Sequence, residues 1–329
     1  MDFSFAGTNP IFIYLLFALG LVLIVKGGDY FVDAATWIAE VSGIPKFIVG
    51  ATVVSFATTL PEMLVSIFAA LKGNSEVAVG NAVGSVTANT GLIMCLSLVC
   101  LPCILKRKQF GINAVILLVA ILGLFLFTFF DGKLSVVESI AIIALSAVFF
   151  IDSVRTAKNG QNSDATPDIE VNQVDAKSVA LNILKFVGGA AGIVIGAQML
   201  IDNGTAIAKM LHVPDAVIAA TMIAIGTSLP ELVTTITAIR KKESSISIGN
   251  IIGANIMDLT LIMPLCVLIQ GEELTIGYQG RYLDIPSCLI ITAAVMVPAL
   301  ILGRFTRWQG FLIGALYIGY LGIMFTCFG

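Results

Sequence analysis

Ten long apolar runs occupy almost the whole of the 329-residue chain. They lie near residues 9–40, 44–71, 76–103, 111–130, 134–154, 178–210, 213–239, 245–270, 285–303 and 309–328. A helix of about 20 apolar residues crosses the hydrocarbon core of a bilayer, so each run is long enough to span. Only 12% of the residues are charged and 58% are apolar, which excludes an ordinary water-soluble domain and a disordered chain. The pattern predicts an all-α integral membrane protein with about ten transmembrane helices.

The charged residues limit the classes of function further. The net charge is −3 at pH 7, which excludes a basic nucleic-acid-binding surface. The chain has one His, His212, and this leaves little room for a catalytic triad or a His-based metal site. We therefore expect a protein that is not an enzyme, has no cofactor and no nucleic-acid partner, and is surrounded by the lipid bilayer.

One polar stretch, residues 155–177, interrupts the apolar pattern near the middle of the chain. It separates a first unit, 1–154, from a second unit, 178–329, and each unit has five apolar runs. If the N-terminus is outside, twelve Lys and Arg residues lie in inside loops and three in outside loops. Cytoplasmic loops carry such an excess of basic residues. We expect a multi-pass protein of the plasma or inner membrane, with both termini outside and the linker in the cytoplasm.

The two halves resemble each other when the sequence is shifted so that Glu62 aligns with Glu231; we call this alignment the repeat register. In it, about 17 of about 52 positions are identical between 43–94 and 212–263, without a gap, and Pro-Glu and Gly-Asn motifs coincide. Because each half has an odd number of spans, the second half enters the membrane from the opposite side. The halves are therefore predicted to be inverted five-helix repeats. This architecture is typical of secondary transporters, whose substrate site lies near the middle of the bilayer.

The second span carries polar residues on one helical face, and the seventh span repeats the pattern. The positions −7, −4, −3 and 0 are occupied by Ser55, Thr58, Thr59 and Glu62, and in the seventh span by Ala224, Thr227, Ser228 and Glu231. A carboxylate inside the bilayer is costly unless it is paired, protonated or bound to a cation. No Lys or Arg lies within the second, third, seventh or eighth span except at its ends. The two glutamates therefore indicate a bound cation.

A proline precedes each of these glutamates. Pro61 and Pro230 have no N–H, so the carbonyl groups of Ala57 and Gly226 lose their helical donors. Carbonyls, hydroxyls and carboxylates form an oxygen-only ligand set, which suits Ca2+ and Na+, whereas Zn2+ or Cu would require His or Cys. The alternative is a kinked helix whose glutamate hydrogen-bonds a neighbour. A motif that occurs twice in register argues against that alternative.

The third and eighth spans add further polar groups. Glycine pairs with the spacing of close helix packing are Gly80–Gly84 and Gly249–Gly253. Four residues after Ser85 and Ala254 come Asn89 and Asp258. We expect Asn89 and Asp258 to complete a site with the two glutamates. This pair alone breaks the symmetry of charge between the halves.

Four more polar residues lie near span ends: Asp29, Asp33, Asp202 and His212. Charged groups at such places reach water or cap a helix at little cost. We expect them to be solvated or to cap helices rather than to bind a transported ion.

These motifs resemble the alpha repeats of the sodium/calcium exchanger family, within the cation/calcium antiporter superfamily. The segments TTLPE and GNAVGSVTAN in the first half, and GTSLPE and GNIIGANIMD in the second, carry the resemblance, which covers the whole chain. The first repeat departs from the family pattern at Ala57, where Gly is usual, and at Val86, where Asn is usual. The loops are too short for a regulatory calcium domain, so the chain is similar to the prokaryotic type without one.

The resemblance implies which residues hold ions. Calcium would lie at the centre, held by Glu62, Glu231, Thr58 and Thr227. One sodium set would comprise Ala224, Thr227, Ser228, Glu231 and Ser85. The other would comprise Ser55, Thr58, Thr59 and Glu62. Ala254 replaces the serine that the second set would take from the opposite repeat, so this set is one ligand short.

Calcium and sodium would share these ligands, and shared ligands exclude simultaneous binding. We therefore expect a secondary antiporter that exchanges sodium for calcium by alternating access and exports calcium. The long first and sixth spans would slide against the core that carries the ligands.

Proton/calcium exchange and potassium-dependent sodium/calcium exchange stay open, because carboxylates also bind protons and Asp258 resembles the acidic position of potassium-dependent relatives. A cation channel is less favoured, because channels usually build their pore from oligomeric symmetry. The oligomeric state stays open.

Overall fold

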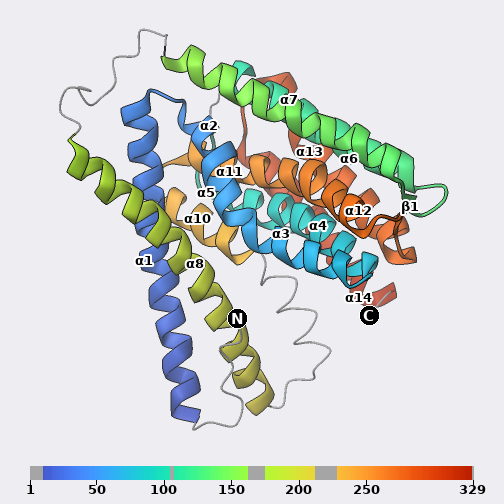
Figure 1. The fold of residues 1–329 in the computed structure, drawn as a ribbon, viewed down its shortest axis with the longest axis horizontal. Coiled ribbons are helices and arrows are strands. Elements are labelled where there is room, and N and C mark those ends of the chain that lie inside the picture. Colours follow the sequence, from blue (N-terminus) through green and yellow to red (C-terminus); the bar gives the residue numbers. More distant parts are fainter. Residues whose placement is uncertain (1–9, 104–106, 162–174, 212–227, 328–329) are drawn as a thin grey trace.

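A computed structural model describes residues 10–103, 107–161, 175–211 and 228–327 (Figure 1). Its α-helices are α1 (Pro10–Ser42), α2 (Lys46–Val49), α3 (Ser55–Leu71), α4 (Ser75–Ala88), α5 (Cys95–Cys100), α6 (Arg107–Thr128), α7 (Val136–Gln161), α8 (Ala176–Met210), α10 (Leu229–Arg240), α11 (Ser244–Met257), α12 (Met263–Gln270), α13 (Ile285–Leu302) and α14 (Arg307–Cys327). The π-helical turns are η1 (Gly50–Val54), η2 (Asn89–Met94), η4 (Asp258–Ile262) and η5 (Gly280–Asp284), and the strands are β1 (Lys133–Leu134) and β2 (Leu274–Thr275). The predicted all-α fold is confirmed.

Nine helical stretches of the described part are long and apolar enough to cross a membrane. They are Pro10–Ser42, Lys46–Leu71, Ser75–Cys100, Phe110–Thr128, Val136–Lys158, Ala176–Ile207, Ser244–Gln270, Gly280–Leu302 and Arg307–Cys327. Each agrees within a few residues with a predicted apolar run. The tenth run, 213–239, lies partly outside the described residues, and its described end forms α10. The structure thus supports the prediction of about ten spans.

The strands β1 and β2 pair antiparallel and join the α6–α7 connection to the α12–α13 connection. Arg281 strengthens this junction, because its Nε donates to the carbonyl oxygen of Phe129, next to the end of α6, at 2.6 Å. Nζ of Lys133 lies 3.0 Å from Oε2 of Glu273. The hydrogen bond and the charge of Glu273 raise the pKa of Lys133.

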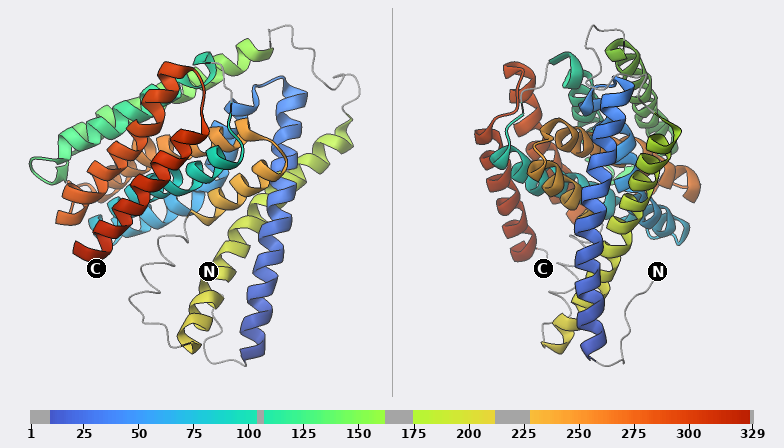
Figure 2. Two further views of the ribbon diagram at one scale, coloured as in Figure 1. Left: turned by 180° about the vertical axis from the view of Figure 1, so that it is seen from behind. Right: turned by 90° about the vertical axis from the view of Figure 1, so that its left-hand side faces the viewer.

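Helices α1 and α8 pack against each other and extend together away from the other helices (Figure 2). Glycines allow the two backbones to approach closely. A Cβ atom added at Gly27 would lie 2.8 Å from the carbonyl oxygen of Gly189, and one added at Gly196 would lie 2.8 Å from that of Gly20. Small residues at such crossings are typical of membrane helix pairs. The two helices therefore form a unit that flanks the main bundle.

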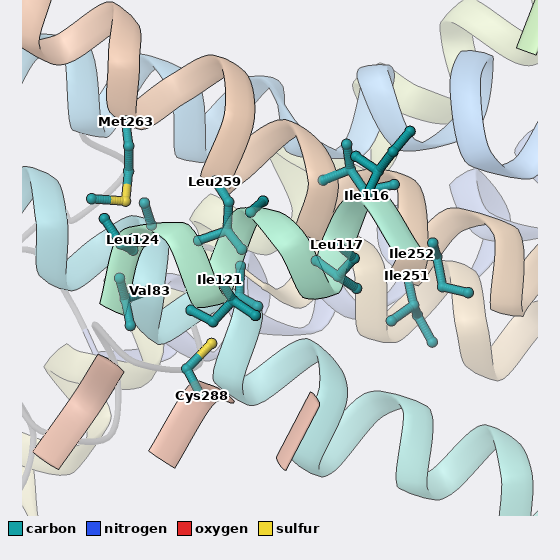
Figure 3. Close-up of a cluster of buried hydrophobic side chains, with 14 of the residues drawn as sticks. Val83, Ile116, Leu117, Ile121, Leu124, Ile251, Ile252, Leu259, Met263 and Cys288 are labelled. Carbon is teal, nitrogen blue, oxygen red and sulfur yellow. The ribbon is translucent and has the colours of Figure 1, made fainter. Parts of the chain in front are cut away.

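The main core lies where α4, α6, α11, α12 and α13 meet (Figure 3). Val83, Ile121, Ile252, Leu259 and Cys288 are among its buried side chains. All residues of α11 from position 246 to position 257 are buried. A helix that is buried all round is surrounded by other helices. Helix α11 is therefore a central element of the bundle.

The glycine pair of α11 brings this helix into backbone contact with α2 and η1. A Cβ atom added at Gly253 would collide with the carbonyl oxygen of Ala51 and lie 2.6 Å from Oγ of Ser55. An added Cβ at Gly249 would collide with the carbonyl oxygen of Phe47. The close helix approach predicted from the sequence is found at this pair.

The equivalent glycines of α4 differ. No atom of the described residues lies within 4 Å of a Cβ atom added at Gly80 or Gly84. The segment that contacts Gly253 is η1, and the segment that corresponds to η1 in the repeat register is 219–223, which lies outside the described residues. The two glycine pairs therefore align in sequence, but within the described residues only the pair of α11 lies in close contact with another helix.

The two halves share local structure in register. Helices α4 and α11 begin at Ser75 and Ser244, and the π-helical turns η2 and η4 begin at Asn89 and Asp258. Both pairs of positions align in the repeat register found in the sequence. Single π-helical turns are rare in proteins overall, and those that occur often lie at functional sites. The two turns thus begin at Asn89 and Asp258, the residues that the sequence predicts to complete the site with the two glutamates.

Gly253→Ala is expected to destabilise the protein by about 1–3 kcal/mol, as for overpacking of a tight core. Thermal unfolding of the purified protein in detergent measures this loss. Gly322→Ala in α14 is the control, because no described atom lies within 4 Å of a Cβ atom at that position. The control should unfold at the same or a slightly higher temperature, since Ala favours a helix over Gly. Equal losses in both variants would contradict the packing role of Gly253.

Candidate functional site

Helix α3 carries four polar residues on one buried face. None of them is more than 4% exposed: Ser55, Thr58, Thr59 and Glu62. The helix runs unbroken through Pro61. Because Pro61 has no N–H, the carbonyl oxygen of Ala57 has no donor four residues later and is available to another partner. Helix α3 thus offers hydroxyl, carboxylate and carbonyl oxygens on one side.

The second Pro-Glu motif lies at a helix start rather than inside a helix. Glu231 is fully buried in the first turn of α10, after Pro230 and Ser228. Proline is well tolerated there, because its missing N–H would have no helical partner anyway. Three residues of this motif lie outside the described residues, namely Ala224, Gly226 and Thr227.

The polar residues of the third and eighth spans face the same region. Asn89 and Asp258 are each 1% exposed, and Ser85 on α4 is 4% exposed. Ala254 on α11 occupies the position equivalent to Ser85 and is fully buried, but it brings no hydroxyl. Helix α3 contacts α4, α10, α11 and η4. Asn89 lies on η2, which contacts α4, α10 and α11 instead of α3 itself, so its element lies one layer further out.

Three carboxyl groups come within electrostatic range of one another. Glu62 interacts with both Glu231 and Asp258, and Asp258 interacts with Glu231. Glu231 also lies near the hydroxyl groups of Thr58 and Thr59, although its oxygens form no hydrogen bond with described residues. The structure thus brings two glutamates from opposite halves of the chain, together with Asp258, into one buried cluster.

None of these three carboxylates has a partner in the described part of the chain. Both oxygens of Glu62, Glu231 and Asp258 are buried without a hydrogen bond, and no ion pair there includes them. The same region has other buried polar atoms without a described partner, on Thr59, Ser228 and Asn89. Buried charges are normally paired or bound to a cation. Thr58, Thr59 and Glu62 all lie near the carboxylate of Glu231, so a hydrogen bond from one of these neighbours is the alternative to a cation there.

The donor atoms of this cluster suit a hard cation. No group of three or more His, Cys, Asp or Glu side chains in the described ranges is placed to hold a metal ion. A cation here would therefore combine carboxylates with hydroxyl, amide and main-chain oxygens. Ca2+ takes about 6–8 oxygen ligands of these kinds, and Na+ takes similar ones. The residues present fit such ions as cargo.

Two asparagines, for which no role was predicted from the sequence, support the cluster. Nδ2 of Asn81 donates to the carbonyl oxygen of Glu62 at 3.1 Å. The hydroxyl of Thr58 donates to Oδ1 of Asn250, also at 3.1 Å. The repeat register aligns these two asparagines, and that alignment was the available signal. Each holds a residue of α3 in place from a neighbouring helix.

The chain is similar to known proteins over most of its length. Residues 12–152 and 181–326 match the family described as sodium/calcium exchanger protein. The sodium/calcium exchanger MaX1 of Methanosarcina acetivorans is 30% identical over 347 residues, which covers 95% of this chain and 98% of the relative. The inner membrane protein YrbG of Escherichia coli is 33% identical over 276 residues, which covers 81% of this chain and 83% of the relative. A solved structure of the sodium-calcium exchanger NCX_Mj superposes with a TM-score of 0.81 at 28% identity and covers 95% of this chain and 99% of that chain. The chain belongs to the sodium/calcium exchanger family.

Proposed function

We propose that the protein is a secondary antiporter that exchanges sodium for calcium across the membrane. The observation that carries the proposal is the buried cluster of Glu62, Glu231 and Asp258, whose carboxylates have no basic partner among the described residues. The family membership and the names of MaX1 and NCX_Mj support sodium and calcium as the ions. The transported ions are cargo, and the proposal involves neither covalent chemistry nor a cofactor.

We assign the ions to overlapping ligands. Calcium would lie between Glu62 and Glu231, with Thr58 and Thr227. One sodium set would use Ala224, Thr227, Ser228, Glu231 and Ser85, and the other Ser55, Thr58, Thr59 and Glu62. Asn89 and Asp258 would complete the centre. Each glutamate would be a ligand of calcium in one state and of sodium in another. The two ions could therefore not be bound at the same time, which is the physical requirement for exchange.

Alternating access would come from the unit formed by α1 and α8. The close glycine crossing of these helices supports movement as one body, and their extension away from the bundle supports sliding. The predicted excess of basic residues on one side supports both termini outside and the linker 155–177 in the cytoplasm. The units 1–154 and 178–329 would be the inverted repeats. With sodium entering down its gradient, calcium would be exported.

Potassium or protons are the second candidate for a coupling ion. Asp258 favours this reading, because it adds a third buried carboxylate where the first repeat has the neutral Asn89. A third negative charge can bind one more monovalent cation or a proton. Separate ion gradients distinguish these cases.

Calcium flux in proteoliposomes tests the proposal directly. An imposed sodium gradient without a potassium or pH gradient is expected to drive calcium uptake, because sodium and calcium compete for the same oxygens. Potassium and proton gradients imposed separately show whether these ions are coupled. Flux that ignores every counter-ion gradient would contradict exchange and favour a channel.

Glu62→Gln and Glu231→Gln are each expected to lower sodium-driven calcium flux by at least about 100-fold, because loss of a ligand charge in a desolvated site costs roughly 3 kcal/mol or more. Glu272→Gln is the matched control, since Glu272 is exposed in the α12–β2 connection. Flux close to that of the unmodified protein is expected for the control. Unchanged flux in the Glu62→Gln, Glu231→Gln double variant would remove the centre of the proposal.

Calcium is expected to stabilise the purified protein, because it compensates charges that are buried without partners. At a concentration 100 times the dissociation constant, the gain is about 2.7 kcal/mol and appears as a higher unfolding temperature. Thermal unfolding in detergent with calcium and with a chelator measures the shift. The double variant should show little shift, and an equal shift in both proteins would indicate binding elsewhere.

A further inference from the structure

The side chain of Asn250 joins the two halves of the chain next to the carboxylate cluster. Asn250 lies on α11 and is fully buried, and its Oδ1 accepts a hydrogen bond from the hydroxyl of Thr58 on α3 at 3.1 Å. Its Nδ2 is buried without a partner among the described residues. Asn250 belongs to none of the ion sets that we propose. Its described contact with the proposed ion site is the hydrogen bond from Thr58.

The position of Asn250 is fixed by the packing of the backbone around it. A Cβ atom added at Gly50 of η1 would lie 3.2 Å from the backbone nitrogen of Asn250, and one added at Gly249 would collide with the carbonyl oxygen of Phe47. Backbones packed this closely have little freedom to shift. Asn250 is therefore a rigid hydrogen-bond acceptor for Thr58, whose helix α3 continues directly from η1.

The hydroxyl of Thr58 has one hydrogen and three acceptors within reach. Besides Oδ1 of Asn250, the carbonyl oxygen of Ser55 lies 3.3 Å from Oγ1 of Thr58, and the carboxylate of Glu231 lies near this hydroxyl. A hydroxyl group has one hydrogen to donate and two lone pairs that accept. The direction of this hydrogen therefore decides whether Thr58 presents a hydrogen or a lone pair to Glu231.

The two directions suit different occupancies of the site. In the ion-free site, a hydrogen turned toward Glu231 would compensate its buried carboxylate. In the ion-bound site, a cation would lie against the oxygen of Thr58, and a hydrogen on that side would repel it. The hydrogen must then turn to an acceptor that binds no ion. Ser55 and Glu231 belong to the proposed ion sets, so Asn250 is the acceptor that remains.

We propose that Asn250 is a positioning residue that takes the hydroxyl hydrogen of Thr58 when an ion binds, so that Thr58 changes from a hydrogen-bond donor of Glu231 into an ion ligand. No covalent bond changes, because only the hydroxyl torsion turns. The inference rests on the proposed function, since it requires Thr58 to bind an ion. Thr59 is the internal comparison, because it also lies near Glu231 but its hydroxyl has no described hydrogen-bond partner.

Asn250→Leu keeps the branched shape of the side chain and removes the acceptor. We expect it to raise the dissociation constant of calcium for the purified protein about three- to tenfold, the range for loss of one hydrogen bond. Isothermal titration calorimetry in sodium-free detergent buffer measures this constant. Asn182→Leu is the matched control, because this buried asparagine of α8 donates to the carbonyl oxygen of Ser178 in its own helix. The control should bind calcium like the unmodified protein.

The unfolding temperature separates this role from a structural one. Because Asn250 is needed only when an ion is bound, Asn250→Leu should leave the unfolding temperature in a chelator nearly unchanged and reduce the rise that calcium brings. If Asn250→Leu does not fold, Asn250→Ala, which removes the same acceptor, should show the same smaller rise with calcium. A residue that merely supports the fold would lower the unfolding temperature equally with and without calcium, and this result would overturn the proposal.

A double-mutant cycle tests whether Asn250 acts through the hydroxyl of Thr58. Thr58→Val removes this hydroxyl, so adding Asn250→Leu to it should change the calcium dissociation constant by less than about twofold. The hydroxyl of Thr59 makes no hydrogen bond with Asn250, so Asn250→Leu should keep its full effect in the Thr59→Val background. Equal effects of Asn250→Leu in both backgrounds would contradict the proposed role of Asn250.

This role can fail separately from the proposed function. If a sodium gradient drives calcium uptake by the unmodified protein but Asn250→Leu leaves calcium binding unchanged, Asn250 has no such role and the exchange stands. If the unmodified protein shows no sodium-driven flux, the exchange itself is wrong.

Discussion

Burying three carboxylates among apolar helices costs free energy, and the surrounding structure has to compensate this cost. Glu62, Glu231 and Asp258 lie in a bundle of membrane-length helices, without a hydrogen bond or a basic partner among the described residues. A charge in such surroundings is stable only when a cation or a proton compensates it. This cost supports our proposal that the cluster is a cation site, in which the surrounding helices would supply hydroxyl, amide and carbonyl oxygens.

The helices around the cluster form two groups that are packed in different ways. Helix α11 is buried on all sides and held against α2 and η1 by backbone contact at Gly249 and Gly253. Close packing of this kind does not deform gradually. Helices α1 and α8 are instead joined to each other at glycines, and α1 forms ion pairs with the end of α10 at an open cavity. The exchange that we propose requires such a combination, since the ligands would stay in place while access changes.

The two repeats share motifs but not surroundings, and the differences fall at sites of function. The Pro-Glu motif lies within α3 in the first half and at the start of α10 in the second. Asn89 corresponds to Asp258 in the repeat register, and Ser85 corresponds to Ala254. Identical halves would favour neither orientation of the carrier. If the protein works by alternating access as we propose, these departures from symmetry are the positions at which its two access states can differ.

The spans and the candidate ion-binding residues could be predicted from the sequence. Hydropathy is a local property and a bilayer fixes the length of a span, so nine predicted runs match helices within a few residues. Helical periodicity likewise put Ser55, Thr58, Thr59 and Glu62 on one face. The tertiary structure decided which distant groups meet. The contact of Thr58 with Asn250, the approach of Glu62 to Glu231, and the ion pairs of Asp33 with Lys241 all join residues far apart in the chain. Such contacts depend on how helices cross, which no local pattern specifies.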